Sequence, residues 1–509
     1  MPGIRFKPGG YIAAVDMGTN SFHMIIAQLL ETGSFKVVDR LKHWVRLGDG
    51  MDRRGRLDEE AVERMLDSLR QFKQLAGGYN APLCCIATSA LRDAPNRASI
   101  LNRLLLELDV HVDVVSGQEE ARLIFQGVRS EGHVSDKPIR IIDIGGGSTE
   151  VMAGNNSGLM VAESMDMGAR RYARMFFADK KYRQSDIDRC QHAAAMKIQS
   201  VSSEYEEWEK APGIGTSGTI RALATLNAEW REGDDDSRLK LKHLRTLLPR
   251  LVECCCKQTG LENMEPERRD TIVAGAIILI EVMSALGMKS LNICLSALRE
   301  GIVFDRVEAH GELPVQPMQA AVKSMARRFA VDRVQSARVM QTSRHIFNTY
   351  AEQLELDEEA AELLDEACTL HEVGLGVCHK RMQLHGGYLI THADLTGITQ
   401  RQQQMLAAIV RFHRKQKPSQ KSVELKGLHP FDVQSVVRLA AILRLAAALN
   451  RTKSGPAAMP EISRYRRGWQ WRFKAKWAAR HEVCIWNSDE EKQPLSKQLG
   501  VSIYLMSEG

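Results

Sequence analysis

The chain of 509 residues has ordinary apolar and charged contents of 44% and 26%, which indicates a globular protein of roughly three or four domains. Its start lacks the apolar stretch of a signal peptide. Its most apolar segment, 272–288, is shorter than a membrane span and contains Glu281, so we expect a buried helix there. The 10 cysteines lack metal-ligand spacing, and we expect a protein of the reducing cytoplasm.

Positive charge gathers towards the C-terminus. Up to residue 310 the chain holds 41 Lys and Arg against 43 Asp and Glu, and beyond it 28 against 20. Most of the excess lies in 411–421 and 464–480. The second stretch also holds Trp469, Trp471 and Trp477. This pattern predicts either a surface for a long polyanion or a solvated basic face with inward-pointing aromatics, and the concentration of charge favours the polyanion.

The first 310 residues alternate between predicted strands and helices. Residues 11–50 are predicted as strands and turns, and 58–75 as an amphipathic helix with acids near its start. Short strands are predicted at 83–87 and 110–115, and the alternation resumes at residue 139 and closes with 296–307. Strand–helix alternation predicts an α/β fold.

Beyond residue 310 the pattern changes. Residues 318–450 have a nearly continuous helical pattern, and after a Pro- and Gly-containing break the last fifty residues alternate. We therefore expect four domains. They are α/β lobes at 1–124 and 125–310, a helical domain at 311–455, and a small β-rich basic C-terminal domain at 456–509.

One sequence pattern occurs twice. YIAAVDMGTNSFHMIIAQ (11–28) and IRIIDIGGGSTEVMAG (139–154) each have an apolar run ending in an aspartate, a glycine-containing turn and a second apolar run. The aligned residues, at one offset of 127, are Asp16 with Asp143, Gly18 with Gly145, and Ser21 with Ser148. Two related lobes with facing turns of free N–H groups are predicted, and such turns bind phosphate. The alternative, two tight hairpins with buried aspartates, leaves the repeat unexplained.

Further glycines and carboxylates point to the same chemistry. GIGTSG (213–218) is a third glycine-rich turn and runs into a helix. Glu119 and Glu120 begin another helix, where adjacent side chains diverge, so one can form an ion pair while the other faces a cleft. Acids at a helix start are common in themselves. Together with Asp143 and Glu150, however, they are carboxylates of the kind that hold a divalent cation.

Six motifs occur in the order of a known family: AAVDMGTNSFHMIIA, TSALRDAPNR, SGQEEARLIFQGV, IIDIGGGSTE, GTSGTIRAL and ALREG. With them the whole chain resembles the exopolyphosphatase/guanosine pentaphosphate phosphohydrolase family of the actin, sugar-kinase and heat-shock ATPase superfamily. The resemblance implies two ribonuclease-H-like lobes, a helical domain similar to the HD phosphohydrolases and a C-terminal cap. It also implies release of the terminal phosphate of inorganic polyphosphate with Mg²⁺, commonly K⁺ as well, and often a homodimer.

The resemblance also implies roles for individual residues. Glu120 corresponds to the catalytic base, Asp143 to the metal-site acid with Glu150 as its companion, and Arg92 to a phosphate clamp. The implied phosphate loops consist of Thr19, Asn20, Ser21, Gly145, Gly146, Gly147, Ser148, Ser217 and Gly218. Such parts suit phosphoryl transfer, which depends on positioning and charge neutralisation. We expect burial to raise the pKa of Glu120, and the basic distal region to act as a track for repeated cleavage.

Two segments depart from the family pattern. Leu295-Ser296 stands where many relatives have Asp-Gly, which brings any nucleotide contact at that turn into question. The His-Asp pair of HD phosphohydrolases is His371-Glu372 here, with His385 and His413 further along. We interpret these side chains as structural rather than metal-binding.

Three other functions remain open from the sequence. A phosphatase acting mainly on guanosine pentaphosphate would use the same machinery, and the full IGGGSTE motif favours polyphosphate only weakly. A sugar or acetate kinase is disfavoured by SGQEEARL and by the basic distal region. A polyanion-binding protein without activity is disfavoured because Glu120, Asp143 and the phosphate turns are all present.

Overall fold

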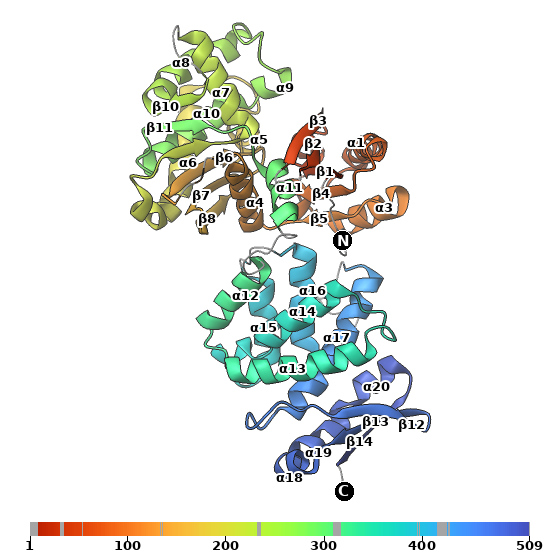
Figure 1. Ribbon diagram of the computed structural model, residues 1–509. Helices are drawn as coiled ribbons and strands as arrows, with labels where there is room; N and C mark the ends of the chain where they lie inside the picture. Colours follow the sequence, from red (N-terminus) through yellow and green to blue (C-terminus); the bar gives the residue numbers. More distant parts are fainter. Residues whose placement is uncertain are drawn as a thin grey trace. The chain divides into compact units, whose positions relative to one another are not determined.

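The computed structural model describes residues 9–30, 35–52, 54–132, 134, 136–231, 236–308, 317–393, 395, 398–414, 425 and 428–507. The chain divides into a compact unit of residues 5–314 and a second unit that holds residues 315–509 (Figure 1). Among the described residues no helix is both long and apolar enough to cross a membrane. The apolar segment that begins at Ile272 forms the buried helix α10 (Ile272–Ala285), as predicted.

The first unit contains two lobes, each built on its own sheet. The sheet of lobe I has the strand order β3-β2-β1-β4-β5, with β2 antiparallel to its neighbours and β4 and β5 parallel to β1. Its strands are β1 (Tyr11–Met17), β2 (Phe22–Leu29), β3 (Phe35–His43), β4 (Leu83–Ala87) and β5 (Val112–Val114). Its helices are η1 (Leu47–Gly50), α1 (Glu59–Gly78), α2 (Ser89–Asp93) and α3 (Arg97–Leu108).

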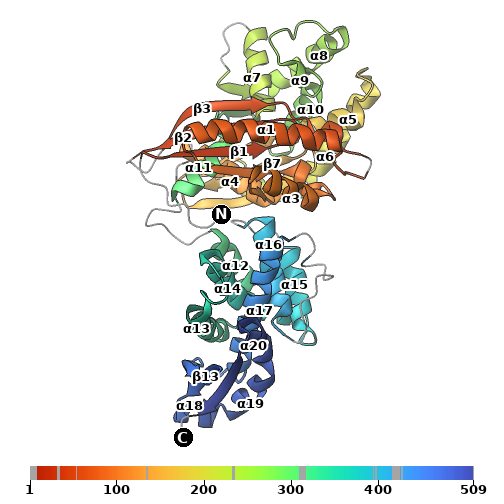
Figure 2. The same ribbon diagram turned by 90° about the vertical axis from the view of Figure 1, so that its right-hand side faces the viewer.

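Helix α1 shows how the sequence determines these elements. Asp58 caps its N-terminus by accepting a hydrogen bond from the backbone N–H of Ala61 at 2.8 Å. Apolar residues at helical spacing, among them Leu69 and Phe72, are fully buried. The helix therefore lies along the sheet of lobe I with its polar face outward (Figure 2).

Lobe II repeats this arrangement. Its sheet has the order β10-β11-β9-β6-β7-β8, in which β8-β7-β6-β9-β11 matches β3-β2-β1-β4-β5 of lobe I. The strands are β6 (Ile139–Ile144), β7 (Thr149–Asn155), β8 (Gly158–Met165), β9 (Gly213–Gly215), β10 (Arg238–Lys240) and β11 (Ser290–Ile293). The helices, besides α10, are α5 (Ala169–Phe176), α6 (Gln184–Ser202), η2 (Ser203–Trp208), α7 (Ser217–Trp230), α8 (Leu241–Lys257) and α9 (Pro266–Arg269). The prediction of two related α/β lobes is confirmed.

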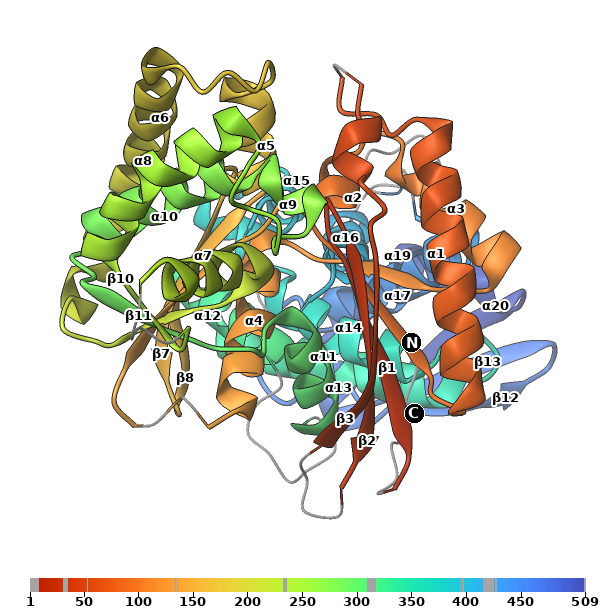
Figure 3. The same cartoon turned by 90° about the horizontal axis from the view of Figure 1, so that it is seen from above.

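The lobes exchange one helix each. Helix α4 (Gly117–Ser130) packs on strands β7 and β8 of lobe II, and α11 (Leu298–Glu308) packs on β1 and β2 of lobe I. The two helices lie side by side between the sheets (Figure 3). They approach so closely that a Cβ on Gly127 would lie 2.0 Å from the carbonyl oxygen of Ala297. The expected boundary at residues 124 and 125 therefore lies inside α4.

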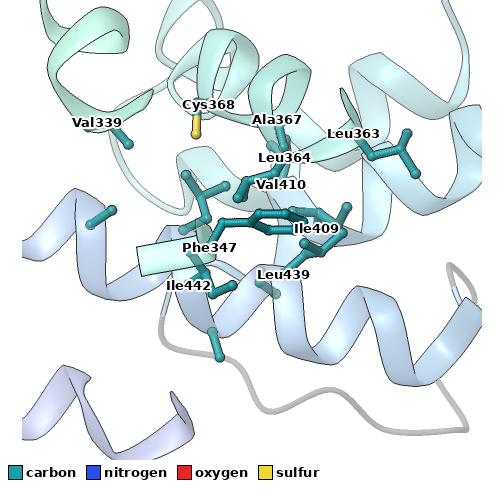
Figure 4. Packing of buried hydrophobic residues seen from close by; sticks show 14 of the residues in the cluster. Val339, Phe347, Leu363, Leu364, Ala367, Cys368, Ile409, Val410, Leu439 and Ile442 are labelled. Carbon is teal, nitrogen blue, oxygen red and sulfur yellow. The ribbon is translucent and has the colours of Figure 1, made fainter. Parts of the chain in front are cut away.

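The second unit is mainly helical, as the sequence predicts. Its helices are α12 (Pro317–Arg328), α13 (Arg333–Tyr350), α14 (Glu358–Leu370), η3 (Val373–Gly376), α15 (Met382–Thr391), α16 (Gln400–Phe412) and α17 (Pro430–Leu449). Residues of α13, α14, α16 and α17, among them Phe347, Leu364, Ile409 and Leu439, interdigitate in its core (Figure 4).

The C-terminal region of this unit mixes strands with helices. It consists of β12 (Glu461–Tyr465), β13 (Gly468–Phe473), α18 (Ala475–Arg480), α19 (Glu482–Glu491), α20 (Gln493–Leu499) and β14 (Ser502–Ser507). The three strands form one sheet in the order β12-β13-β14. Trp471, Phe473 and Ile503 belong to the same buried cluster as the preceding helices, so residues 456–507 share one core with the helical region.

Candidate active site

The two repeated turns have the same backbone arrangement. In lobe I, strands β1 and β2 pair so that Asp16 lies opposite His23. In lobe II, β6 and β7 pair so that Asp143 lies opposite Glu150. Each aspartate is thus the last residue but one of the strand before the turn, and the residue opposite it is the second residue of the strand after the turn. The sequence repeat corresponds to one structural element that is present in both lobes.

The two turns face each other at close range. A Cβ on Gly146 would lie 3.2 Å from the Cβ of Thr19 in the other lobe. A Cβ on Gly147 would lie 2.3 Å from the Oγ of Ser89 and 3.0 Å from the Oγ1 of Thr19. Side chains at Gly146 and Gly147 would push the lobes apart, which explains the glycines at these two positions. The backbone N–H groups of both turns therefore border one narrow space.

Each lobe adds a second hydroxyl-bearing turn. Thr216 precedes helix α7 and donates its Oγ1–H to Asp143 Oδ2 at 2.5 Å. Ser217 has a positive φ of 70°, which is uncommon for a residue with a side chain and frequent at binding sites. Thr88 precedes α2 of lobe I with nearly the same backbone angles as Thr216. The third turn predicted from the sequence therefore has a counterpart in lobe I.

These turns enclose a cavity of about 160 Å³ between the lobes. All predicted residues of the phosphate loops line it, together with Glu120 and Asp143. The lining members of the predicted set are Thr19, Asn20, Ser21, Gly145, Gly146, Gly147, Ser148, Ser217, Gly218, Glu120 and Asp143. Arg92 and Glu150 were also predicted for the site, but they are not among the residues that line the cavity.

The adjacent glutamates of α4 are separated as expected. Glu119 forms a buried two-point ion pair with Arg122, with both nitrogen–oxygen distances at 2.8 Å. Glu120 instead lines the cavity. Burial raises its pKa above the ordinary value for glutamate, and the nearby Arg92 opposes that rise. Of these two glutamates, Glu120 is therefore the one that can act in the cavity.

Arg92 holds Glu120 from the side away from the cavity. Its Nη1 donates to Glu120 Oε2 at 3.1 Å and to the carbonyl oxygen of Val115 at 3.2 Å. In this structure the predicted phosphate clamp thus contacts the predicted base directly. An arginine that also bonds to the backbone fixes the position of the carboxylate it pairs with.

Glu150 is buried behind the lobe II turn. It accepts a hydrogen bond from Ser164 Oγ at 2.7 Å and lies near the side chain of Ser148. Burial and the nearby carboxylates of Glu120 and Asp143 raise its pKa well above the ordinary value. Its position suits a residue that supports the turn.

Asp16 is a cavity residue that the sequence analysis did not assign to the site. Burial, together with the charges of Glu120, Asp143 and Glu300, raises its pKa to about 7, and Arg299 opposes the rise. Burial likewise raises the pKa of Asp143, against the hydrogen bond from Thr216 and the charges of Arg221 and Arg299. The repeat itself was a signal for Asp16, because this residue aligns with Asp143.

Two aspartates of the cavity, Asp16 and Asp143, are candidates to hold Mg²⁺. Among the described residues there is no group of three or more His, Cys, Asp or Glu arranged to hold a metal ion. Mg²⁺, however, is commonly held by one or two carboxylates, with water and substrate phosphates completing its shell. Asp16 and Asp143 both line the cavity, so they fit such a site, and a bound cation would favour their ionised forms against the burial that raises their pKa values.

Arginines form another side of the cavity. The lining cations are Arg170, Arg221, Arg268 and Arg299. Burial and the charges of Arg299 and Arg268 lower the pKa of Arg221, which shows that these cations crowd one another. Their concentration attracts a multiply charged anion. Arg221 and Arg299 occur within the quoted motifs, but their convergence depends on the fold.

The departures from the family pattern lie outside the cavity. Leu295 is exposed, and Ser296 donates to Glu131 Oε1 at 2.6 Å; neither residue lines the cavity.

In the second unit, the buried His371 has its Nδ1 2.7 Å from the carbonyl oxygen of Cys368, and Glu372 pairs with Lys453 at 2.6 Å. Buried His413 has its Nδ1 2.5 Å from the carbonyl oxygen of Val410.

The aromatic side chains of the basic C-terminal stretch point inward, as expected for a solvated basic face. Trp471 is fully buried and donates its Nε1–H to the hydroxyl of Tyr350 at 2.9 Å. Trp469 and Trp477 are partly buried against the same core. The tryptophans are thus structural, and only the cations remain for a polyanion. Of the other basic stretch, residues 415–421 lie outside the described residues.

The paired lobes and the turns between them define a two-lobed protein of the actin-like class. Residues 25–310 match the Ppx/GppA phosphatase family, and 318–492 match domain III of Ppx/GppA phosphatases. The chain belongs to the Ppx/GppA phosphatase family. The expected two-lobed fold with a helical domain is thereby confirmed.

Two solved structures resemble the two lobes. An exopolyphosphatase from Cytophaga hutchinsonii is 26% identical and superimposes with a TM-score of 0.55, over 59% of this chain and 99% of that one. An exopolyphosphatase-like protein is also 26% identical, with a TM-score of 0.52, over 59% of this chain and 98% of that one.

Proposed function

We propose that this phosphatase is an exopolyphosphatase, which removes the terminal phosphate of inorganic polyphosphate. The observation that carries the proposal is the cavity between the lobes. It combines backbone turns from both lobes, a cluster of arginines, and Glu120, a carboxylate held by Arg92 that lines the cavity. The names of the two similar structures support polyphosphate as the substrate.

The cavity suits the chemistry of phosphoryl transfer, which needs an in-line arrangement and neutralised equatorial oxygens. The N–H groups of the 18–21 and 145–148 turns donate to the oxygens of the terminal phosphate. The arginines neutralise charge on that phosphate and on the next one. Glu120 accepts the proton of the attacking water, and a raised pKa makes it a stronger base near neutral pH.

Mg²⁺ is the cofactor of this proposal. When bound, it shares the charge of the phosphate oxygens and orients them. Asp16 and Asp143 are the residues placed to hold it, because both carboxylates face the cavity. Glu150 supports Ser148 from behind.

Exposed cations of the second unit provide a further surface for the chain of phosphates. They include Arg466, Arg472 and Lys474 around β13. In this proposal they bind polyphosphate by charge, and successive cleavage without release follows from that binding.

Phosphate release from three substrates tests the proposal. Long-chain polyphosphate, guanosine pentaphosphate and ATP with a sugar are compared, each with Mg²⁺ and with EDTA. We expect the highest kcat/KM for polyphosphate, dependent on Mg²⁺, with phosphate lost from chain ends in gel analysis. Hydrolysis of guanosine pentaphosphate without phosphate release from polyphosphate would instead support a phosphatase that acts on guanosine pentaphosphate.

A further inference from the structure

His23 is a cavity residue with no role so far. It lies on β2, directly opposite Asp16, and lines the cavity. Its Nε2 is 2.8 Å from the Oγ of Ser21 in the lobe I turn. Its Nδ1 is 3.5 Å from Nη1 of Arg299 on α11. The imidazole therefore connects an arginine to a serine of the phosphate turn.

The chemistry of these partners fixes where the ring carries its proton. A guanidinium has only donors, so Arg299 can bond to Nδ1 only if that nitrogen carries a lone pair. A neutral imidazole then has its hydrogen on Nε2, which faces Ser21. A doubly protonated ring would point a second N–H at a cation. Burial and nearby cations, Arg299 first among them, lower the pKa of His23 accordingly.

The position of this proton determines what Ser21 can do. If Nε2–H donates to Oγ, the serine accepts from the histidine, and its own O–H is left to donate elsewhere. Ser21 lines the cavity. Its hydrogen is thus available for a phosphate oxygen, which has no donor of its own.

The equivalent position in lobe II holds a carboxyl group in place of the imidazole. Glu150 occupies the place of His23 in the strand register, and it accepts a hydrogen bond from Ser164 Oγ at 2.7 Å. An ionised carboxylate accepts hydrogen bonds, whereas the neutral Nε2–H of His23 donates one. The same backbone therefore carries two turn serines whose neighbours differ in chemistry.

We propose that His23 is a positioning residue: oriented by Arg299, it holds Ser21 as a hydrogen-bond donor to the terminal phosphate of the substrate. The inference rests on the proposed function for the identity of the substrate. It assigns no proton transfer to His23, which acts through Ser21.

Three exchanges of His23 separate this role from simple packing. His23→Gln places an amide N–H near the position of Nε2 and an oxygen that can accept from Arg299. We expect it to keep kcat/KM for polyphosphate within about threefold. His23→Glu places an acceptor there and should lower kcat/KM by about tenfold or more, the size expected for a lost hydrogen bond to a charged group. His23→Phe should also lower kcat/KM by about tenfold.

A double-mutant cycle with Ser21→Ala tests the path of the effect. If His23 acts through Ser21, then His23→Phe adds little once Ser21 is alanine. Losses that multiply in the double variant would overturn the proposal, as would equal rates for the Gln, Glu and Phe variants. Thermal unfolding of each variant shows whether the folded state has been kept.

A second histidine–serine pair in lobe I provides the control. His43 Nδ1 lies 2.9 Å from Ser68 Oγ, and neither residue lines the cavity. His43→Gln and Ser68→Ala should alter stability and leave kcat/KM unchanged. Calorimetric binding of tripolyphosphate separates a failure of the His23 role from a failure of the proposed function. If the wild type binds tripolyphosphate and cleaves polyphosphate but the His23 cycle is additive, only the role of His23 is contradicted. If the wild type shows neither binding nor turnover, the proposed function is contradicted.

Discussion

The β1–β2 turn and the β6–β7 turn share a backbone and differ in the side chains that support it. Both strands before the turns have an aspartate as their last residue but one, and both turns end in a serine. Asp143 accepts a hydroxyl hydrogen bond from Thr216, whereas among the described residues Asp16 has no such donor. The serine of lobe I is hydrogen-bonded to a neutral histidine, His23, and the equivalent register position in lobe II holds a carboxyl group, Glu150.

A duplicated element can thus keep its backbone geometry while the side chains of its two copies take on different roles. The N–H of Gly145 donates to the carbonyl oxygen of Ser148 at 2.9 Å, and the other residues of both turns line the cavity, where their N–H groups can meet an anion. The side chains around them have diverged, with the donor Ser21 on one side and the buried, acid-supported Ser148 on the other. Exchanges that affect one turn and spare the other should therefore have unequal effects.

The largest effect on the rate of phosphate release is expected from exchange of Glu120, the predicted base. Glu120→Gln should lower the rate of phosphate release by between about a hundredfold and ten-thousandfold, because the water loses its base. Binding of tripolyphosphate should persist. The matched control is Glu119→Gln, which should lower the melting temperature through its buried pair with Arg122 and leave the rate nearly unchanged. Equal rates for wild type and Glu120→Gln would remove Glu120 from the base role.

A displacement of the lobe II turn alone should have the next largest effect. A Cβ on Gly168 would lie 2.3 Å from the carbonyl oxygen of Gly146, behind the turn and outside the cavity lining. Gly168→Ala should lower kcat/KM by up to about a hundredfold, the cost of a misplacement near 1 Å. Gly77→Ala, at a site in α1 with no atom within 4 Å, should leave kinetics unchanged. An unaffected Gly168→Ala enzyme would show that the turn position is unimportant.

The smallest effect concerns stability and distinguishes the two aspartates. The pKa of Asp16 is raised from 3.8 to about 7 in the folded protein. The contribution of Asp16 to the free energy of unfolding therefore falls as pH rises from about 4 through about 7. In EDTA, Asp16→Asn should therefore unfold at a higher temperature than wild type at pH 8 and at a similar one at pH 4. The gain is at most about 4 kcal/mol.

Asp143→Asn provides the comparison for that measurement. It should gain less at pH 8, because exchange of Asp143 also alters the hydrogen bond from Thr216. Melting temperatures across this pH range measure both variants. An Asp16→Asn protein that is less stable than wild type at pH 8 would contradict the raised pKa.

Patterns close together in sequence predicted the elements well. The strand Leu83–Ala87 was expected at its observed bounds, because its apolar run is closed by turn-forming neighbours. The repeat located both phosphate turns, since a fixed offset reflects a duplicated backbone. The divergence of Glu119 and Glu120 followed from helical geometry alone.

Side-chain directions and long-range contacts were beyond the sequence. Arg92 and Glu150 belong to motifs of the site, yet one pairs with Glu120 and the other supports a turn from behind. Both orientations depend on neighbours far away in the chain. The exchange of α4 and α11 between the lobes rests on the close approach at Gly127, which no local pattern records.

The central claim is that both turns hold the same terminal phosphate. A crystal structure of the Glu120→Gln variant with Mg²⁺ and tripolyphosphate tests it most directly. The account predicts one phosphate within hydrogen-bond distance of N–H groups in both 18–21 and 145–148, with the Ser21 hydroxyl donating to it. A tripolyphosphate bound by one lobe only, or outside the cavity between the lobes, would contradict it.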